Sequence, residues 1–283
     1  MTGPRKAMIR AYMDRNAWQD LYDRRSGITA KNVERLRSAV RHREIDIAVS
    51  VRCLEETYAR HTREPLLAMA EVRFIFDVAG STNPRRVRLV KEPAQHVDDD
   101  IRAYAARLAV PSPYMVLDMS PFLVRGADYR LAEEFARATR SEDHSFYDFM
   151  DRQRRESANR LVGISFEDYF ETEAPELARG LAEKARALSE LEVRGVEGLL
   201  ELRSVRMAVG SNLSLSYSQR VGNRAPQDGD WGDMFHAIAA AAADVFVTND
   251  RGLAECLRRI PAVPIEIIDL KALFSRLRSP LLT

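Results

Sequence analysis

Short apolar runs and amphipathic segments alternate near both ends of the chain, which is the pattern of an α/β fold. Near the amino end, residues 7–13 and 45–49 are apolar runs that predict strands. Helical periodicity follows each run, and the order strand, two helices, strand, helix predicts a parallel sheet with crossover helices. These three helices are predicted at residues 16–24, 29–43 and 50–61.

The same alternation returns near the carboxyl end, after a long segment in which helical periodicity dominates. Because both ends share this pattern, we expect residues 1–61 and 216–283 to form the two halves of one domain around a single sheet. Residues 62–215 are then a mostly α-helical insertion. The elements predicted near the carboxyl end are helices at 231–243, 251–259 and 270–277 and strands at 244–248 and 265–268.

Within the insertion, Pro65–Ala79 is a strongly apolar segment that predicts a helix in need of a partner surface, in this chain or in another. Residues 81–96 are polar and contain two prolines, which predicts a loop, and the proline-rich residues 111–126 predict irregular structure. Further helices are predicted at about 97–108, 128–140, 144–159, 174–191 and 195–218.

The composition limits the class of protein. The 283 residues are 46% hydrophobic, which suffices for a sizeable core. Lys plus Arg number 43 and Asp plus Glu 42, so the net charge is +1 and any phosphate-binding surface must be local. The two cysteines, Cys53 and Cys256, lie in apolar helical contexts and are expected to be reduced. Without a signal peptide or an apolar run of roughly 20 residues, the chain is expected to be cytoplasmic and to have no membrane partner.

Two acidic residues follow predicted strands at opposite ends of the chain. Asp14 follows the first strand and Asp250 follows the strand at 244–248, and each precedes a helix. Either residue could serve only as an N-cap, a role in which Asp is common. The carboxyl ends of parallel strands also meet at the edge of the sheet where α/β folds bind ligands, so the pair predicts a cluster of acids at that edge.

Further acids lie near the starts of two predicted helices. Asp230 and Asp233 are three residues apart and share one helical face, and His236 follows on the same side. A favourable interaction with the helix dipole is the simpler explanation for the two aspartates. Glu55 and Glu56 lie one turn into the helix after the second strand, where only one can face the cluster and periodicity does not decide which.

An acidic cluster of this kind is typical of sites for hard divalent cations. Mg²⁺ and Mn²⁺ take oxygen ligands and commonly act on phosphate esters. Motifs for other chemistries are absent, because the sequence has no GxGxxG after a strand, no phosphate-binding loop, no GxSxG elbow and no HExxH or paired CxxC. We therefore expect Mg²⁺ or Mn²⁺ as the cofactor.

Basic residues in the predicted loop at 81–96 are candidates for nucleic-acid binding. Arg85, Arg86 and Arg88 lie close together there and could reach a phosphate backbone. Most basic runs of this kind are only solvated surface. We consider a role in binding because the acidic cluster indicates a phosphate ester as substrate.

Three segments resemble parts of PIN-like domains. Residues 12–18, YMDRNAW, resemble the YLDTN-type opening of that family, and residues 47–56, IAVSVRCLEE, resemble its second strand and the helix that carries a Glu. Residues 229–253, GDWGDMFHAIAAAAADVFVTNDRGL, closely resemble its closing segment of acid, helix, strand and final acid. Residues 62–215 show no resemblance to the family.

The resemblance implies a three-layer α/β/α sandwich with a parallel sheet and a metal-dependent nuclease that usually acts on RNA. It implies that the catalytic and metal-binding acids are Asp14, Glu56, Asp233 and Asp250, with Glu55 as the alternative to Glu56.

The resemblance also extends to neighbouring residues. Asp230 matches an additional acid one turn before Asp233 and is a further candidate metal ligand. Asn16 and Thr248 match small polar residues beside the first and last acids, and His236 is a supporting candidate. Arg15 departs from the family, because a small hydroxyl residue is usual at that position.

We therefore expect a Mg²⁺- or Mn²⁺-dependent endoribonuclease. A DNA-directed nuclease of the same fold and a non-catalytic module that binds nucleic acid or has a regulatory role are the alternatives. A homodimer would cover the apolar helix Pro65–Ala79. An antitoxin or another regulatory protein is a further candidate partner, although the chain is long for a small toxin.

Overall fold

A single six-stranded sheet organises the part of the chain that the structure describes. The computed structural model describes residues 8–61, 64–80, 86–118, 137, 163–191, 197–221, 224–227 and 229–277. The strands within these residues have the order β4-β3-β2-β1-β5-β6. Neighbouring strands are parallel except β3 and β4, which are antiparallel. The strands are β1 (Ile9–Met13), β2 (Ile45–Ser50), β3 (Arg86–Val90), β4 (Tyr114–Asp118), β5 (Val245–Val247) and β6 (Glu266–Ile268).

Helices cover both faces of the sheet, because alternate strand residues point to opposite faces and both sets are apolar. Ala11 and Met13 of β1 belong to the hydrophobic core on one face, whereas Tyr12 between them belongs to the core on the other. The first core is completed by α1 (Arg15–Asp23), α2 (Ala30–Arg41), α3 (Val51–Arg60), α4 (Pro65–Ala79) and α13 (Leu270–Arg276).

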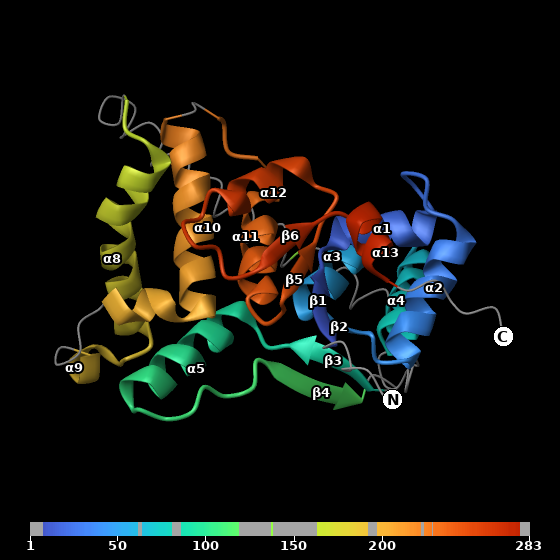
Figure 1. Cartoon of the computed structure of the whole chain (residues 1–283), viewed down its shortest axis with the longest axis horizontal. Coiled ribbons are helices and arrows are strands. Elements are labelled where there is room, and N and C mark those ends of the chain that lie inside the picture. The colour runs from blue at the N-terminus through green and yellow to red at the C-terminus, as the bar shows by residue number, and fades with distance from the viewer. Residues whose placement is uncertain are drawn as a thin grey trace, which may run out of the picture.

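The second core packs under the helices that lie to the left of and behind the sheet in Figure 1. Its central helix is α10, which contacts α5, α8, α11 and α12. The α/β class predicted from the sequence is therefore confirmed. The elements on this face are α5 (Pro93–Ala105), α8 (Phe166–Lys184), α9 (Leu188–Leu191), η1 (Glu197–Glu201), α10 (Arg203–Arg220), α11 (Asp230–Ala240) and α12 (Arg251–Arg258).

Two strands lie where the sequence analysis predicted loops. β3 lies within residues 81–96 and β4 lies within residues 111–126, so both loop predictions are wrong there. The predicted strands do pair in parallel, but the sheet as a whole is mixed, because β4 runs antiparallel to β3. Pro111 and Pro113 led to the prediction of irregular structure at β4. Both precede its first residue, and proline is tolerated before a strand at the edge of a sheet.

The predicted division of the chain at residues 62 and 215 stays a prediction. Strands β3 and β4 come from the proposed insertion, yet they extend the same sheet as β1 and β2. Helix α4 finds its partner within this chain, since Val72, Ile75 and Phe76 are buried in the first core. The helices predicted at 128–140 and 144–159 fall outside the described residues, apart from residue 137.

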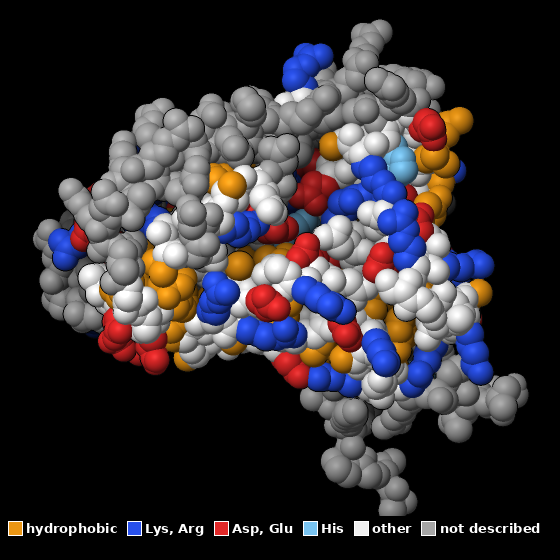
Figure 2. All heavy atoms as spheres, turned by 90° about the horizontal axis from the view of Figure 1, so that it is seen from above, with side chains coloured by type: hydrophobic (Ala, Val, Ile, Leu, Met, Phe, Trp, Pro, Cys, Tyr) orange, Lys and Arg blue, Asp and Glu red, His pale blue; other side chains and the backbone are white. Residues whose placement is uncertain are grey.

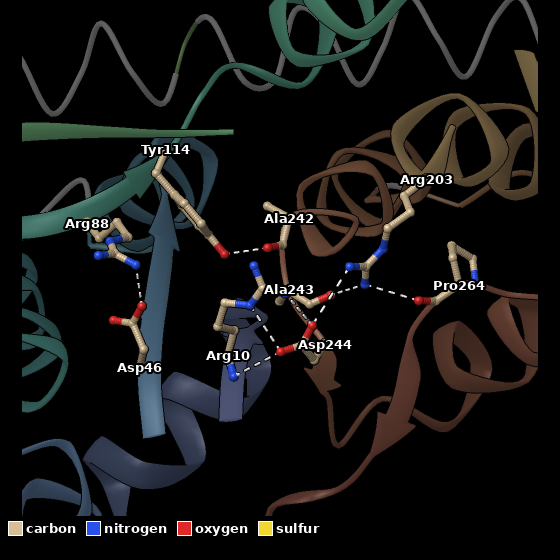
Figure 3. A network of polar contacts seen from close by, with 9 residues as sticks. All are labelled: Arg10, Asp46, Arg88, Tyr114, Arg203, Ala242, Ala243, Asp244 and Pro264. Carbon is tan, nitrogen blue, oxygen red and sulfur yellow. Dashed lines mark hydrogen bonds and ion pairs between the residues drawn. The ribbon is translucent and has the colours of Figure 1, made fainter. Parts of the chain in front are cut away.

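A polar network ties the second helical layer to the amino ends of the strands (Figure 3). Arg10 of β1 donates two hydrogen bonds to Asp244, which precedes β5, at 2.8 and 3.0 Å. Arg203 at the start of α10 donates to the carbonyl oxygens of Ala243 and Pro264, and Tyr114 of β4 donates to that of Ala242. These bonds fix the turn between α11 and β5, and therefore the position of both elements relative to β1.

Both cysteines are free thiols: Cys53 is buried and Cys256 is half-buried. None of the helices in the described ranges combines the length and the apolar character needed to cross a lipid bilayer.

Candidate metal centre

Three neighbouring strands end in residues that cap the helices after them. Asp14 follows β1, and its Oδ1 accepts from the amide of Ala17, 2.7 Å away, in the first turn of α1. Asp250 follows β5 by three residues and accepts from the amide of Leu253 in α12 in the same way. Ser50 caps α3 after β2. Because β1 lies between β2 and β5, these three ends meet at one edge of the sheet, and Asp14 and Asp250 are helix caps as well as strand-end acids.

A cavity of about 460 Å³ opens at this edge. Figure 2 looks down on the molecule from above and shows acidic side chains in a hollow between Lys and Arg side chains. The cavity is lined by Glu56 but not by Glu55, which decides between the two residues that periodicity left open. The predicted site residues that line it are Asp14, Asn16, Glu56, Asp230, Asp233, His236 and Asp250.

Glu56 is held by two basic partners. His236 Nε2 lies 2.9 Å from Glu56 Oε2, and Arg52 Nε donates to Oε1 at 3.0 Å. Burial alone would raise the pKa of Glu56, but the charges and hydrogen bonds of these partners outweigh it and lower the pKa to about 2. Burial likewise disfavours the charged form of His236, yet Glu56, Asp14 and Asp233 raise its pKa. The two shifts agree, and they describe a charged pair.

The pair is anchored to the sheet through β1 and β2. Nδ1 of His236 lies 2.6 Å from the hydroxyl of Tyr12, which in turn lies 2.8 Å from the hydroxyl of Ser50. A protonated His236 donates from both ring nitrogens, so the Tyr12 hydroxyl accepts from Nδ1 and donates to Ser50. All three residues are buried. His236 is therefore a positioning residue that links helix α11 to Glu56 on α3.

Gly232 allows α11 to approach this pair. A Cβ atom at Gly232 would lie 2.5 Å from Oε1 of Glu56 and 3.4 Å from Nη2 of Arg52. Real Cβ contacts of 2.5 Å are essentially never seen, so any larger residue would displace the Glu56 carboxylate or the helix. The glycine is thus required by the close packing of α11 against α3, and its backbone angles play no part.

Asp14 and Asp233 are the acids with the most disfavoured charge. Burial is the largest cause for both, and it raises the pKa of Asp14 to about 6 and that of Asp233 to about 7. Asp250 adds repulsion to both, whereas the positive charge of His236 partly offsets the rise. Two carboxylates that are costly to ionise, side by side in one cavity, form a site that gains from a bound cation.

The acids differ in how many oxygen atoms they have available. Asp14 accepts from Thr248 through Oδ2 in addition to its capping bond, and Thr248 is buried behind it. Asp250 uses only Oδ1 for capping. Asp233 lines the cavity and accepts no hydrogen bond from any residue that the structure describes.

Asp230 is bound on all sides by protein donors. Arg224 donates to both of its oxygens, at 2.7 and 3.0 Å. The amide of Gln227 and the side chain of Gln219 also donate to Oδ2. The structure thus favours a role for Asp230 in fixing the loop before α11, and its role as a metal ligand stays a prediction.

The donor set suits a hard cation, although it is not preassembled around one point. Within the described residues, no three His, Cys, Asp or Glu side chains are already arranged to hold one ion. The residues that fit best are Asp14, Asp233 and Asp250, because carboxylate oxygens are the preferred ligands of Mg²⁺ and Mn²⁺ and Asp233 has no competing donor. Glu56 fits less well, because Arg52 and His236 already place positive charge beside its two oxygens.

Of the predicted nucleic-acid-binding arginines, Arg88 is the one whose side chain the structure describes, and it does not line this cavity. Arg88 is the middle residue of β3, and its side chain pairs with Asp46 near the amino end of β2 (Figure 3). Its guanidinium lies over the ring of Tyr114. Arg86 opens the same strand, and Arg85 lies outside the described residues. The sequence predicts a loop for this segment, so it could not indicate where in the sheet Arg88 would lie.

Sequence reasoning missed the residues that hold the acids in place. Arg52 could have been found, because it lies four residues before Glu56 on one helix, a spacing typical of ion pairs. Tyr12, Ser50 and Arg224 gave no comparable signal, since their contacts cross from one element to another.

Comparison with known proteins identifies no relative: no protein-family model, no curated protein and no solved structure matches this chain. Fold and cavity therefore define the class by themselves. The chain is an α/β protein with a cavity of carboxylates at the carboxyl edge of its parallel strands.

Proposed function

We propose that this protein is a Mg²⁺- or Mn²⁺-dependent nuclease that hydrolyses phosphodiester bonds, with RNA as its main substrate. One observation carries the proposal: Asp14, Glu56, Asp233 and Asp250 come from four separate segments, and all line the same cavity. Burial, and to a smaller degree repulsion among these acids, raises the pKa values of Asp14 and Asp233, so their charged forms are costly without a cation. A fold keeps such an arrangement most readily where a cation offsets it.

The residues divide into ligands and positioning groups. A bound Mg²⁺ or Mn²⁺ would supply an activated water and would stabilise negative charge on the phosphate. Asp14, Asp233 and Asp250 would hold the ion, with Thr248 keeping the Asp14 carboxylate oriented. His236 would set the position of Glu56 at the wall of the cavity.

The PIN-like fold is part of the same proposal. The segments that resemble the family carry the four acids, and the structure brings those segments to one edge of the sheet. The choice of RNA over DNA rests on the resemblance alone, so the substrate must be identified by experiment.

The test is cleavage of labelled RNA and DNA, each single- and double-stranded, in Mg²⁺, in Mn²⁺ and in EDTA. The proposal predicts cleavage in at least one metal, none in EDTA, and faster cleavage of RNA. Metal-dependent cleavage of DNA alone would support the DNA-directed alternative. Binding of nucleic acid without cleavage in any metal would contradict the proposal.

A non-catalytic module is the second candidate, because one observation favours it. Both oxygens of Glu56 are already occupied by Arg52 and His236, so this acid is neutralised without a metal. A module of this kind would bind nucleic acid equally well in metal and in EDTA, and Mg²⁺ would leave its melting temperature unchanged.

A further inference from the structure

Arg15 is a cation without a partner at the wall of an acidic cavity. It follows Asp14 directly, opens α1 and lines the same cavity as the four acids. Its Nε and Nη2 atoms are shielded from water, and neither has a hydrogen-bond partner. Among the described residues, no carboxylate lies within ion-pair distance of its guanidinium, although several lie in the same cavity.

The other basic groups around the cavity are engaged. Arg52 pairs with Glu56, and Arg224 pairs with Asp230. Arg60, which also lines the cavity, forms an ion pair with Asp23, with 3.7 Å between Nη2 and Oδ2. Arg15 therefore differs from its neighbours, because the residues that the structure describes give its charge no ion-pair partner and two of its nitrogens no acceptor.

Such an arrangement is costly for the free protein. A shielded N–H group without an acceptor loses its hydrogen bonds to water and gains none in return. Native structures seldom keep unpaired polar atoms, and one beside a binding cavity calls for an acceptor that comes from outside. The acceptor must be anionic to match the guanidinium, and it must fit beside carboxylates that prefer a cation.

We propose that Arg15 binds a phosphate group of the nucleic-acid substrate, an inference that rests on the nuclease function proposed above. Because Nε and Nη2 are shielded in the free protein, the side chain must turn toward the cavity to bind phosphate. The guanidinium can then donate two parallel hydrogen bonds to phosphate oxygens, a contact for which arginine is well suited. The metal ligands and Arg15 are then complementary: the acids of the cavity hold the cation, and Arg15 holds the anion. Arg15 is thus a substrate-positioning residue next to Asp14.

The test measures binding of a labelled single-stranded RNA in EDTA, where no cleavage is expected, and again in Ca²⁺. The variants are Arg15→Ala and Arg15→Lys, and the matched control is Arg179→Ala, which removes an exposed arginine from α8, outside the acidic cavity. Arg15→Ala is expected to bind about 10-fold more weakly, and the slope of log affinity against log salt should fall by about 1. Arg15→Lys should recover part of the loss, and Arg179→Ala should bind like the wild type.

Thermal stability separates this role from a structural one. Because Arg15 makes no compensating contacts, Arg15→Ala should melt no lower than the wild type. A lower melting temperature together with weaker binding would overturn the inference, since Arg15 would then support the fold.

Two further outcomes distinguish the inference from the function on which it rests. If the wild type binds RNA and Arg15→Ala binds equally well, the inference about Arg15 fails and the nuclease proposal stands. A larger Mg²⁺-induced rise in melting temperature for Arg15→Ala, with unchanged RNA binding, would show that Arg15 only repels the metal. If the wild type binds neither RNA nor DNA under any condition, the proposed function itself fails.

Discussion

At the residue scale, the arrangement is a set of acids, of which two are difficult to ionise and one is already neutralised. Asp14 and Asp250 could be predicted from sequence, because an acid after an apolar strand has a defined place in an α/β fold. Periodicity could not choose between Glu56 and Glu55, because neighbouring helical residues differ only in direction, and the resemblance alone favoured Glu56. The hydrogen bonds from Arg224 to Asp230 could not be predicted from the sequence either, because they depend on the course of the loop before α11.

The first prediction concerns the pH dependence of stability without metal. The pKa values of Asp14 and Asp233 rise on folding, to about 6 and about 7, so the folded state binds their protons more tightly. The free energy of unfolding should therefore fall as the pH rises from about 4 to about 7. The raised pKa of His236 has the same sign at slightly higher pH. The lowered pKa of Glu56 adds no slope above its ordinary value of 4.5.

Thermal melting in EDTA at about pH 5.5 and about pH 8 checks this expectation, with Asp233→Asn as the comparison. The wild type should lose more stability than Asp233→Asn between these two values. Equal losses in both proteins would show that Asp233 titrates normally.

The second prediction concerns proton release. At a pH near 6, Asp14 and Asp233 are partly protonated, and a cation that binds them must displace those protons. Calorimetric titration with Mg²⁺ in two buffers of different ionisation enthalpy should therefore give different apparent enthalpies, and the difference should vanish near pH 9. An identical enthalpy in both buffers at pH 6 would mean that these carboxylates do not receive the metal.

At the element scale, helix α11 is set in place by its contacts with α3 and by the network at its carboxyl end. The helix, β5 and α12 were predicted close to their observed bounds, because periodicity and capping residues agree there. Strands β3 and β4 were missed because neighbouring prolines and polar residues outweighed a short alternation such as RVRLV. Their strand character comes from pairing with β2 and with each other, which is information from the tertiary structure.

The third prediction is that Gly232→Ala disrupts the site. Replacing glycine by alanine inside a helix ordinarily stabilises a protein by about 1 kcal/mol. At Gly232 the new Cβ would meet Glu56 Oε1, so the variant should be less stable than the wild type and should cleave RNA more slowly.

Gly180→Ala in α8 is the matched control, because a Cβ there meets nothing within 4 Å. It should be about as stable as the wild type or up to about 1 kcal/mol more stable, and equally active. If both variants gained stability equally, the close contact between α11 and Glu56 would be refuted.

At the scale of the whole molecule, segments from both ends of the chain meet at one edge of a sheet. Strand β1 pairs with β2 on one side and β5 on the other, so Asp14 and Asp250 are far apart in the sequence but close in space. The α/β class followed from the repeated strand–helix pattern, whereas the contribution of β3 and β4 to the same sheet required the structure.

The fourth prediction is that Mg²⁺ stabilises the whole molecule. A ligand that binds only the folded state at 100 times its Kd adds about 2.7 kcal/mol, which raises the melting temperature by several degrees in a chain of this size. Asp14→Asn and Asp233→Asn should lose this increase. Asp269→Asn should keep it, because Asp269 also caps a helix after a strand but does not line the acidic cavity.

The most direct test of the account is cleavage of single-stranded RNA by the wild type, Asp14→Asn, Asp233→Asn and Asp269→Asn, side by side in Mn²⁺. Asparagine can still cap a helix at positions 14 and 269, and Asp233 accepts no hydrogen bond from a described residue, so each variant should fold. The account predicts that Asp269→Asn cleaves like the wild type, while the two cavity variants are slower by about 100-fold or more. Undiminished cleavage by folded Asp14→Asn and Asp233→Asn would contradict the assignment of the acidic cavity as a nuclease site.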